Sequence, residues 1–355
     1  MTALRALIAD QIRLNGPMTL AEYMSVCLGH PEHGYYRKQD PLGAAGDFTT
    51  APEISQMFGE MIGLWLASTW VEDGQPEQIV LAELGPGRGT LMADALRAAK
   101  AVPGFVDAAR VHLVETSPAL RDKQADALGS YRVSWSDDIE GLPQGPLYLI
   151  ANEFFDALPI RQFMRQGETW AEKVVGLDEK GALAFGFAPP SAHGALQDIE
   201  VADGAVVETA APGAAIAQSI GARIATHGGA ALIVDYGDWD GTGDTFQALS
   251  QHEPVDPLEA PGDADLTAHV GFRPLAQAAS EGGARAAGFA TQGAFLERLG
   301  ITARAETLAA RLSGDALTSH IAAHRRLLHP DEMGGLFKVL AIRPPGQSAI
   351  GFADA

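Results

Sequence analysis

The chain has 355 residues, of which 46% are hydrophobic and 20% are charged, and its formal net charge at pH 7 is −20. This composition predicts a globular protein with a large buried core. The acidic balance argues against a protein that binds nucleic acid or an anionic membrane surface. Apolar runs stay well short of the ~20 residues that a membrane-spanning helix needs, so we expect no membrane insertion. Cys27 is the only cysteine, which excludes an internal disulfide and makes a reducing, cytoplasmic compartment the simplest expectation.

The first 75 residues are expected to form a helical segment ahead of the main domain. Within residues 1–16, apolar side chains recur at helical spacing, namely at Leu4, Leu7, Ile8 and Ile12. The same stretch contains Asp10 and lacks the continuous apolar run of a signal peptide. We therefore expect it to form an amphipathic helix of the folded protein.

The main domain is predicted over residues 76–345, where short apolar runs alternate with helical patterns. Strands are predicted over residues 78–84, 110–115, 131–135, 146–151, 230–235 and 336–342. Helices over residues 91–100 and 117–128 separate the first three strands. This alternation predicts an α/β fold with a mostly parallel sheet that is covered on both faces. In such sheets ligands bind at the carboxyl ends of the strands.

Two insertions interrupt this alternation. Residues 160–205 contain a predicted β-hairpin around Asp178–Gly181. Residues 238–270 are rich in Gly, Asp, Pro and His, as expected of a loop near a functional site. Residues 346–355 are expected to form a short tail.

A glycine-rich turn follows the first predicted strand, where residues 82–90 read Ala-Glu-Leu-Gly-Pro-Gly-Arg-Gly-Thr. The turn has no lysine for a nucleoside triphosphate loop, and its third glycine comes one residue too early for a dinucleotide turn. The spacing favours S-adenosylmethionine (SAM), whose carboxylate can be held by backbone amides at a helix start, while Glu83 faces its cationic end. The cofactor-binding residues predicted here are Glu83, Gly85, Pro86, Gly87 and Gly89.

The next two strand ends supply further acids. Glu115 could accept hydrogen bonds from both ribose hydroxyls of SAM, and Asp137 or Asp138 could accept one from the adenine amino group. The order of strand, glycine turn, helix, strand and acid is the order that nucleoside binding on a doubly wound sheet requires. The alternative interpretation is a tight strand-to-helix turn that binds no ligand.

A second group of polar residues follows the strand over 146–151, in the sequence Asn152-Glu-Phe-Phe-Asp-Ala-Leu-Pro159. Glu153 and Asp156 are three residues apart, so they share a face on a helical turn. Paired carboxylates match the fixed fork of a guanidinium group and could orient it for attack on the methyl group of SAM. Asn152 is assigned to the cofactor side of the same rim. The alternative is that Asn152 and Asp156 only cap the turn.

Several longer motifs carry a family resemblance. They are Gly46–Glu60, Glu83–Thr90, Asn152–Pro159, Ile233–Gly237, Asp265–His269 and Met333–Lys338. With these motifs in this order, the chain resembles the MidA-like family of SAM-dependent methyltransferases, which is similar to the mitochondrial arginine methyltransferase that assists assembly of respiratory complex I. The resemblance implies a class I, Rossmann-like fold with a seven-stranded sheet, a helical segment at the N-terminus and an inserted substrate region. It also implies a protein substrate with an accessible arginine, for which a complex I subunit is the candidate.

The resemblance gives a role to the segment near residue 50, and a strand end and the loop over 238–270 add residues that could line the acceptor cleft. The segment near residue 50 is expected to fold over the cofactor as a lid that excludes water. The predicted lid and acceptor-side residues are Thr49, Thr50, Glu53, Gln56, Asp235, His252 and His269. His320 and His324 have metal-ligand spacing on a helix but lack a third ligand nearby, so we expect no metal.

Two other functions remain open at this stage. One is an oxidoreductase that uses a nicotinamide cofactor, which the glycine spacing disfavours. The other is an assembly factor without catalytic activity that uses the fold to hold a partner. The sequence favours a SAM-dependent protein arginine methyltransferase over both.

Overall fold

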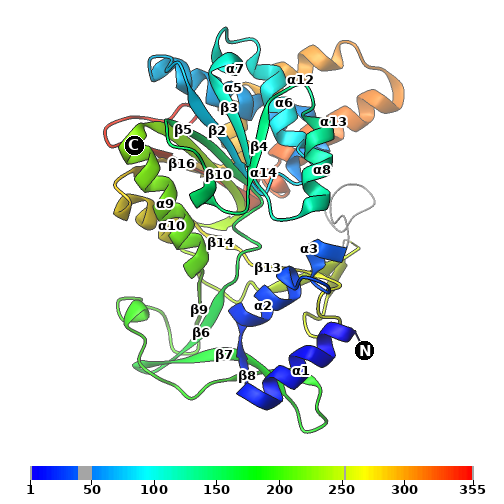
Figure 1. Ribbon diagram of the computed structural model, residues 1–355, viewed down its shortest axis with the longest axis vertical. Coiled ribbons are helices and arrows are strands. Elements are labelled where there is room, and N and C mark those ends of the chain that lie inside the picture. Colours follow the sequence, from blue (N-terminus) through cyan, green and yellow to red (C-terminus); the bar gives the residue numbers. More distant parts are fainter. Residues whose placement is uncertain (1, 39–49, 252, 354–355) are drawn as a thin grey trace. The chain divides into compact units, whose positions relative to one another are not determined.

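The computed structural model describes residues 2–38, 50–251 and 253–353. The chain forms two compact units, which are described separately below (Figure 1). Unit 1 consists of residues 1–48, 156–213 and 239–271. Unit 2 consists of residues 49–155, 214–238 and 272–355.

The centre of unit 2 is a mixed β-sheet. Seven strands of its described part follow the order β15 (Arg285–Thr291), β16 (Phe337–Arg343), β10 (Gly229–Asp238), β5 (Leu147–Asn152), β2 (Ile79–Leu84), β3 (Ala109–Val114) and β4 (Val133–Ser136). The five strands from β10 to β4 are parallel, and β16 is antiparallel to both of its neighbours. Every residue of β2 and β5 is buried, as expected of strands covered on both faces.

Each strand predicted for this sheet is present within a few residues of its predicted bounds. The sequence analysis missed β15, because its Ala- and Gly-rich sequence lacks the branched and aromatic side chains that mark a strand.

Helices cover both faces of this sheet (Figure 1). One face carries α5 (Gln56–Glu72), α6 (Thr90–Ala99) and α8 (Pro118–Ala127), and the other carries α9 (Ala211–His227) and α10 (Phe272–Glu281). Two glycines let α5 cross α6 at short distance. A Cβ atom added at Gly63 would lie 2.3 Å from the Ala95 carbonyl oxygen, and one at Gly59 would lie 2.7 Å from the Asp94 side chain. Larger residues at these positions would separate the two helices.

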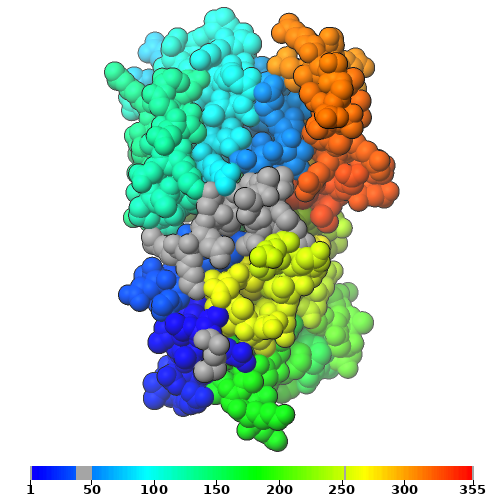
Figure 2. Space-filling view, turned by 90° about the vertical axis from the view of Figure 1, so that its right-hand side faces the viewer, coloured from blue at the N-terminus to red at the C-terminus, as the bar shows by residue number. Residues whose placement is uncertain are grey.

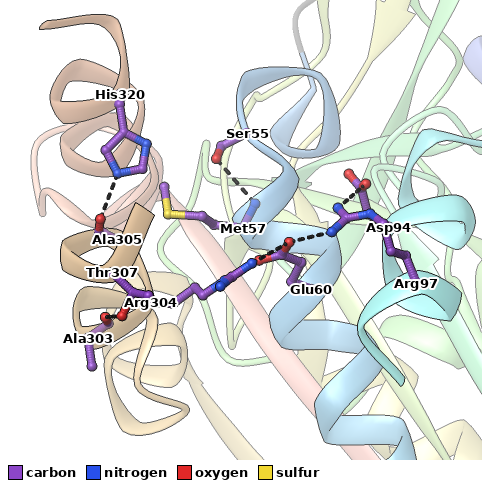
Figure 3. Close-up of polar contacts among 10 residues, drawn as sticks. All are labelled: Ser55, Met57, Glu60, Asp94, Arg97, Ala303, Arg304, Ala305, Thr307 and His320. Carbon is purple, nitrogen blue, oxygen red and sulfur yellow. Dashed lines mark hydrogen bonds and ion pairs between the residues drawn. The ribbon is translucent and has the colours of Figure 1, made fainter. Parts of the chain in front are cut away.

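A group of helices precedes the last strand: α11 (Gln292–Arg298), α12 (Ile301–Ala309), α13 (Gly314–Leu328) and α14 (Met333–Leu336). In Figure 2 α12 and α13 appear in orange. Glu60 on α5 holds α12 in place, because its buried carboxylate accepts hydrogen bonds from Arg304 Nε and Arg97 Nη1, each at 2.7 Å (Figure 3). Burial alone would raise the pKa of Glu60, but these hydrogen bonds outweigh it and lower the pKa. His320 Nε2 on α13 donates to the Ala305 carbonyl oxygen at 3.0 Å.

The expected boundaries of the main domain differ from those of unit 2. Residues 49–75 belong to unit 2, because the apolar helix α5 packs on its sheet and on α6. Residues 346–353 also pack against this core and form no free tail. The indole nitrogen of Trp65 donates to the Ile350 carbonyl oxygen at 2.9 Å, and the rings of Phe295 and Phe352 lie 5.0 Å apart.

Unit 1 combines helices from the start of the chain with strands from both predicted insertions. Its helices are α1 (Ala3–Asn15), α2 (Leu20–Gly29) and α3 (Tyr35–Lys38). One of its sheets has the order β1 (Met18–Thr19), β7 (Thr169–Leu177), β6 (Arg161–Gln166) and β9 (Val206–Thr209), with β8 (Leu183–Phe187) paired to β7. A smaller sheet has the order β12 (Glu253–Val255), β11 (Gln247–Ser250) and β13 (Asp265–Thr267).

The hairpin predicted around Asp178 is confirmed by β7 and β8. On α1, Leu4, Ile8 and Ile12 are buried as predicted, whereas Leu7 is 48% exposed. The first helices, in blue, and the segment over 253–271, in yellow, lie side by side in Figure 2. Within the described ranges, the structure contains no helix with the length and apolar character needed to cross a bilayer.

Candidate functional site

The glycine turn after β2 has the conformation that its sequence requires. Gly85, Gly87 and Gly89 have φ angles of 61°, 53° and 82°, in the left-handed region that side chains disfavour. Gly89 is the N-cap of α6, so the turn leads directly into the start of that helix. An open backbone of this kind at a helix N-terminus suits a ligand carboxylate such as that of SAM. Pro86 is buried within the turn.

Glu83 has a different environment from the one expected. Its side chain is 3% exposed and accepts a hydrogen bond from the backbone N–H of Met92, in the first turn of α6. Burial raises the pKa of this carboxyl to about 8, so a neutral acid is favoured at neutral pH. Glu83 thus satisfies a backbone amide of α6, while its Oε2 has no hydrogen-bond partner among the described residues. Contact of Glu83 with the cationic end of SAM stays a prediction.

Glu115 occupies the predicted position after β3 and is held by local hydrogen bonds. Its Oε1 accepts from the Ser117 amide at 2.7 Å, and Oε2 accepts from Gln124 Nε2 at 3.3 Å. Burial, the largest effect, raises the pKa of Glu115. Gln124 also donates to the Gly87 carbonyl oxygen at 2.7 Å and accepts from Trp135 Nε1 at 2.8 Å. Gln124 therefore links Glu115 to the glycine turn.

The sequence analysis did not select Gln124. A signal was present, because Gln124 lies four residues after Leu120 on the inward face of α8, where an apolar residue is expected.

The two acids proposed for adenine have local partners. Asp137 pairs with Arg121 at 2.7 Å on the surface, and Asp138 Oδ1 accepts from the Gly141 amide at 3.0 Å. Their role in adenine binding stays a prediction.

The turn at Asn152–Phe155 follows β5 and contains a strained residue. Glu153 has φ of 51°, which is uncommon for a residue with a side chain and is found most often at functional sites. The fully buried carboxylate of Asp235 holds the turn, since its Oδ2 accepts from the amides of Phe154 at 3.2 Å and Phe155 at 3.0 Å. Asp235 was expected to line the acceptor cleft. Its carboxylate accepts hydrogen bonds from the backbone of this turn, and a role in the acceptor cleft stays a prediction.

The carboxylate of Glu153 also holds the segment that begins at residue 50. Its Oε1 accepts from the Ala51 amide and from Asn152 Nδ2, both at 3.0 Å. Ala51 starts the short helix α4 (Ala51–Ile54), for which Thr50 is the N-cap. Glu53 on this helix accepts from Thr90 Oγ1 at 2.6 Å, next to the glycine turn. The segment is therefore attached to both turns, as a lid over the cofactor would require.

The remaining predicted residues lie in unit 1 or at the edge of the lid segment. Gln56 is exposed at the start of α5. Asp156 is buried in unit 1, and its carbonyl oxygen accepts from the Ala268 amide at 3.0 Å. The next residue, His269, donates its amide to Thr245 Oγ1 at 2.9 Å. Asp156 and the His269 segment thus come together. The predicted residues Thr49 and His252 lie outside the described residues.

Tyr36 is a further residue that the sequence analysis missed. Its hydroxyl donates to Asp265 Oδ1 at 3.1 Å. Burial, followed by the charges of Asp265 and Asp156, raises the pKa of Tyr36 well above the usual tyrosine value. The neighbourhood of Asp156 is therefore acidic, which suits a cationic ligand.

An α/β sheet with this glycine turn, an acid after the next strand and a strained polar turn two strands away defines a SAM-dependent methyltransferase. Residues 61–290 match the family described as "Putative S-adenosyl-L-methionine-dependent methyltransferase". The chain belongs to this family. The cofactor is therefore SAM.

Relatives agree with this assignment over nearly the whole chain. Proteins named protein arginine methyltransferase NDUFAF7, mitochondrial, are 39% identical in Danio rerio and 36% identical in Homo sapiens. Each match covers 94% of this chain, and 85% and 82% of the relatives respectively. A protein from Burkholderia thailandensis, solved with bound S-adenosyl-homocysteine, is 28% identical with a TM-score of 0.85. That match covers 98% of this chain and 94% of the other.

The expectation of a cytoplasmic compartment is contradicted. The curated relatives are named as mitochondrial proteins. A chain with a single cysteine cannot form an internal disulfide in any compartment, so its cysteine count does not identify one.

Proposed function

We propose that this methyltransferase acts on an arginine side chain of a protein. The observation that carries the proposal is 36–39% identity, over 94% of the chain, to relatives named as protein arginine methyltransferases. We further propose that the sheet of unit 2 is the class I, seven-stranded methyltransferase sheet. The family resemblance makes a subunit of respiratory complex I the candidate substrate.

The proposed cofactor site consists of the glycine turn, Glu115 and the segment over residues 50–54. Gly85, Gly87 and Gly89 leave room for the methionine carboxylate near the start of α6. Glu115 has the carboxylate needed to accept hydrogen bonds from the ribose. The attachment of Glu53 to Thr90 supports a lid that excludes water from this site.

We propose that Glu153 of unit 2 contacts the acceptor and, separately, that Asp156 and His269 of unit 1 bind a cationic group. SAM, when bound, would supply a methyl group on a sulfonium. Transfer to a guanidinium nitrogen breaks the S–CH₃ bond, forms one N–C bond and leaves S-adenosyl-homocysteine, while that nitrogen loses one proton. Carboxylates can orient the guanidinium by bidentate hydrogen bonds. They can also stabilise the charge that develops on it. The strained backbone of Glu153 and the acidic surroundings of Asp156 support these roles.

The proposal is tested by methyl transfer from SAM with a labelled methyl group. The acceptor is an extract of cells that lack this protein, and the modified residue is mapped by mass spectrometry. We expect label on arginine. Label on lysine or on a small molecule would overturn the arginine assignment. An absence of label in an extract that contains the natural partners would favour an assembly factor without catalytic activity.

A further inference from the structure

We propose that the side-chain oxygen of Asn152 binds a cationic N–H donor that one of the two reactants brings to the site. Asn152 is the last residue of β5 and is 7% exposed. The inference deepens the proposed function and rests on it for the identity of the methyl acceptor.

The orientation of the Asn152 amide follows from its contact with Glu153. The amide lies 3.0 Å from Glu153 Oε1. An ionised carboxylate accepts hydrogen bonds and donates none, so the NH₂ group must face Glu153. The Ala51 amide donates to the same oxygen, which fixes the carboxylate from a second side. The Oδ1 atom of Asn152 must therefore point away from Glu153.

The side-chain oxygen of Asn152 is a buried hydrogen-bond acceptor. Among the described residues no donor lies within hydrogen-bond distance of Asn152 Oδ1. A buried polar atom without a partner is costly, and native structures keep few of them. A ligand that donates to Oδ1 would remove this cost. Gln292 Oε1 is also buried without a donor among the described residues, so the position of Asn152 beside the glycine turn is what points to a binding contact.

The position of Asn152 identifies the reactants that can reach it. Strands β2 and β5 are parallel and pair Leu84 with Ala151, so Asn152 is level with Gly85 in the glycine turn. A Cβ atom added at Gly85 would lie 2.9 Å from the ring of Phe154, which shows that the two turns pack together. Asn152 thus lies beside the site proposed for the methionine end of SAM.

Two cationic groups carry suitable N–H donors there. One is the ammonium group of the methionine end of SAM, and the other is the guanidinium of the acceptor arginine. A neutral amide oxygen suits either group, because it accepts the hydrogen bond without competing as a nucleophile for the methyl group. The anionic Glu153 behind the amide strengthens the acceptor by polarising it.

The test uses Asn152→Ala, which removes the acceptor. SAM affinity is measured by calorimetry. The kcat/KM of methyl transfer is measured with the peptide identified by mass mapping. We expect Asn152→Ala to weaken one of the two by about 10- to 100-fold.

Whether SAM affinity or kcat/KM falls identifies the group that donates to Asn152 Oδ1. A loss of SAM affinity assigns the ammonium group, and a loss of kcat/KM at unchanged SAM affinity assigns the guanidinium. The proposal is wrong if Asn152→Ala leaves both within twofold. If wild-type protein methylates no arginine, the proposed function fails. The SAM affinity of Asn152→Ala still decides whether Asn152 contacts the cofactor.

Gln292 provides a matched control. It is also a fully buried amide whose Oε1 accepts no hydrogen bond from the described residues, and its Nε2 donates to the Leu327 carbonyl oxygen at 3.0 Å. Gln292→Leu should leave SAM affinity and kcat/KM unchanged. If Asn152→Ala does not fold, the side-chain NH₂ resonances of Asn152 in wild-type protein give an independent readout. They should shift on addition of S-adenosyl-homocysteine or of the mapped peptide, and no shift with either would overturn the proposal.

Discussion

The turns after β2 and β5 lie at the same edge of one sheet but differ in the residues that take a left-handed backbone, which are glycines after β2 and Glu153 after β5. Each turn has a buried unsatisfied oxygen nearby among the described residues, Glu83 Oε2 and Asn152 Oδ1. Around the glycine turn, Glu115 and Gln124 are joined to the backbone by hydrogen bonds. The turn after β5 combines a strained backbone at Glu153 with the unsatisfied oxygen on Asn152. The contacts of Glu115 and Gln124 support the proposal that the first turn is preformed for the cofactor. The second retains strain and binding capacity, which is typical of the place where chemistry occurs.

The largest effect is expected where the preformed turn is broken. Gly87 has φ of 53°, so Gly87→Val forces a branched side chain into the left-handed region and into the space proposed for the methionine carboxylate. SAM affinity should fall by at least about 100-fold, or roughly 2.7 kcal/mol. Calorimetry measures the affinity and circular dichroism checks the fold. A folded variant with wild-type affinity would remove SAM from this turn.

A smaller effect on the same turn is expected for Glu115→Ala. Loss of hydrogen bonds to a charged group should weaken SAM binding by about 1–3 kcal/mol. Ligand-free protein should also melt at a lower temperature, because Ser117 and Gln124 lose a partner. If the melting temperature falls but the folded fraction binds SAM normally, Glu115 serves folding alone.

Glu83, near the end of β2, should make the stability of the protein depend on pH. Its folded pKa is raised to about 8, so the folded chain keeps a proton that the unfolded chain loses in the usual glutamate range. Stability therefore falls as the pH rises from about 5 to 8. Glu83→Gln keeps an acceptor for Met92 and stays neutral, so at pH 8 it should be more stable than wild type by about 1–3 kcal/mol. Parallel stability curves against pH for the two proteins would contradict this account.

The smallest effect is expected at Glu60, which belongs to neither turn. Its lowered pKa means that its contribution to stability is present at neutral pH and is lost as the pH falls through that pKa. Arg97 and Arg304 are partly exposed, so Glu60→Gln should cost about 1 kcal/mol at pH 7 and less at pH 3. Urea unfolding at the two pH values measures this. SAM binding should not change, and a large loss of affinity would show that α5 is coupled to the cofactor site.

The sequence predicts the features that depend on neighbouring residues. Each strand of the parallel sheet, the glycine turn and the acid at Glu115 follow from local patterns. Gln124 and Tyr36 escaped notice because their roles depend on partners distant in sequence, such as Trp135 and Asp265.

Unit 1 could not be predicted for the same reason, because its packing depends on contacts between segments distant in sequence. Its three segments come from separate parts of the chain, and no local periodicity indicates that they pack together. The strain at Glu153 has no sequence signal either, because Asp235 and the β-sheet impose it.

Labelled methyl transfer by wild type and Glu153→Gln tests the central claim most directly. The variant keeps the size of the side chain and removes its charge, so SAM binding should survive. Transfer to arginine should fall by about 100-fold, because the acceptor loses alignment and charge stabilisation. Asp156→Asn is measured separately and should also lower transfer, because the acidic surroundings of Asp156 suit a cationic acceptor. Equal labelling of arginine by wild type and Glu153→Gln would contradict the assignment of catalysis to the turn after β5.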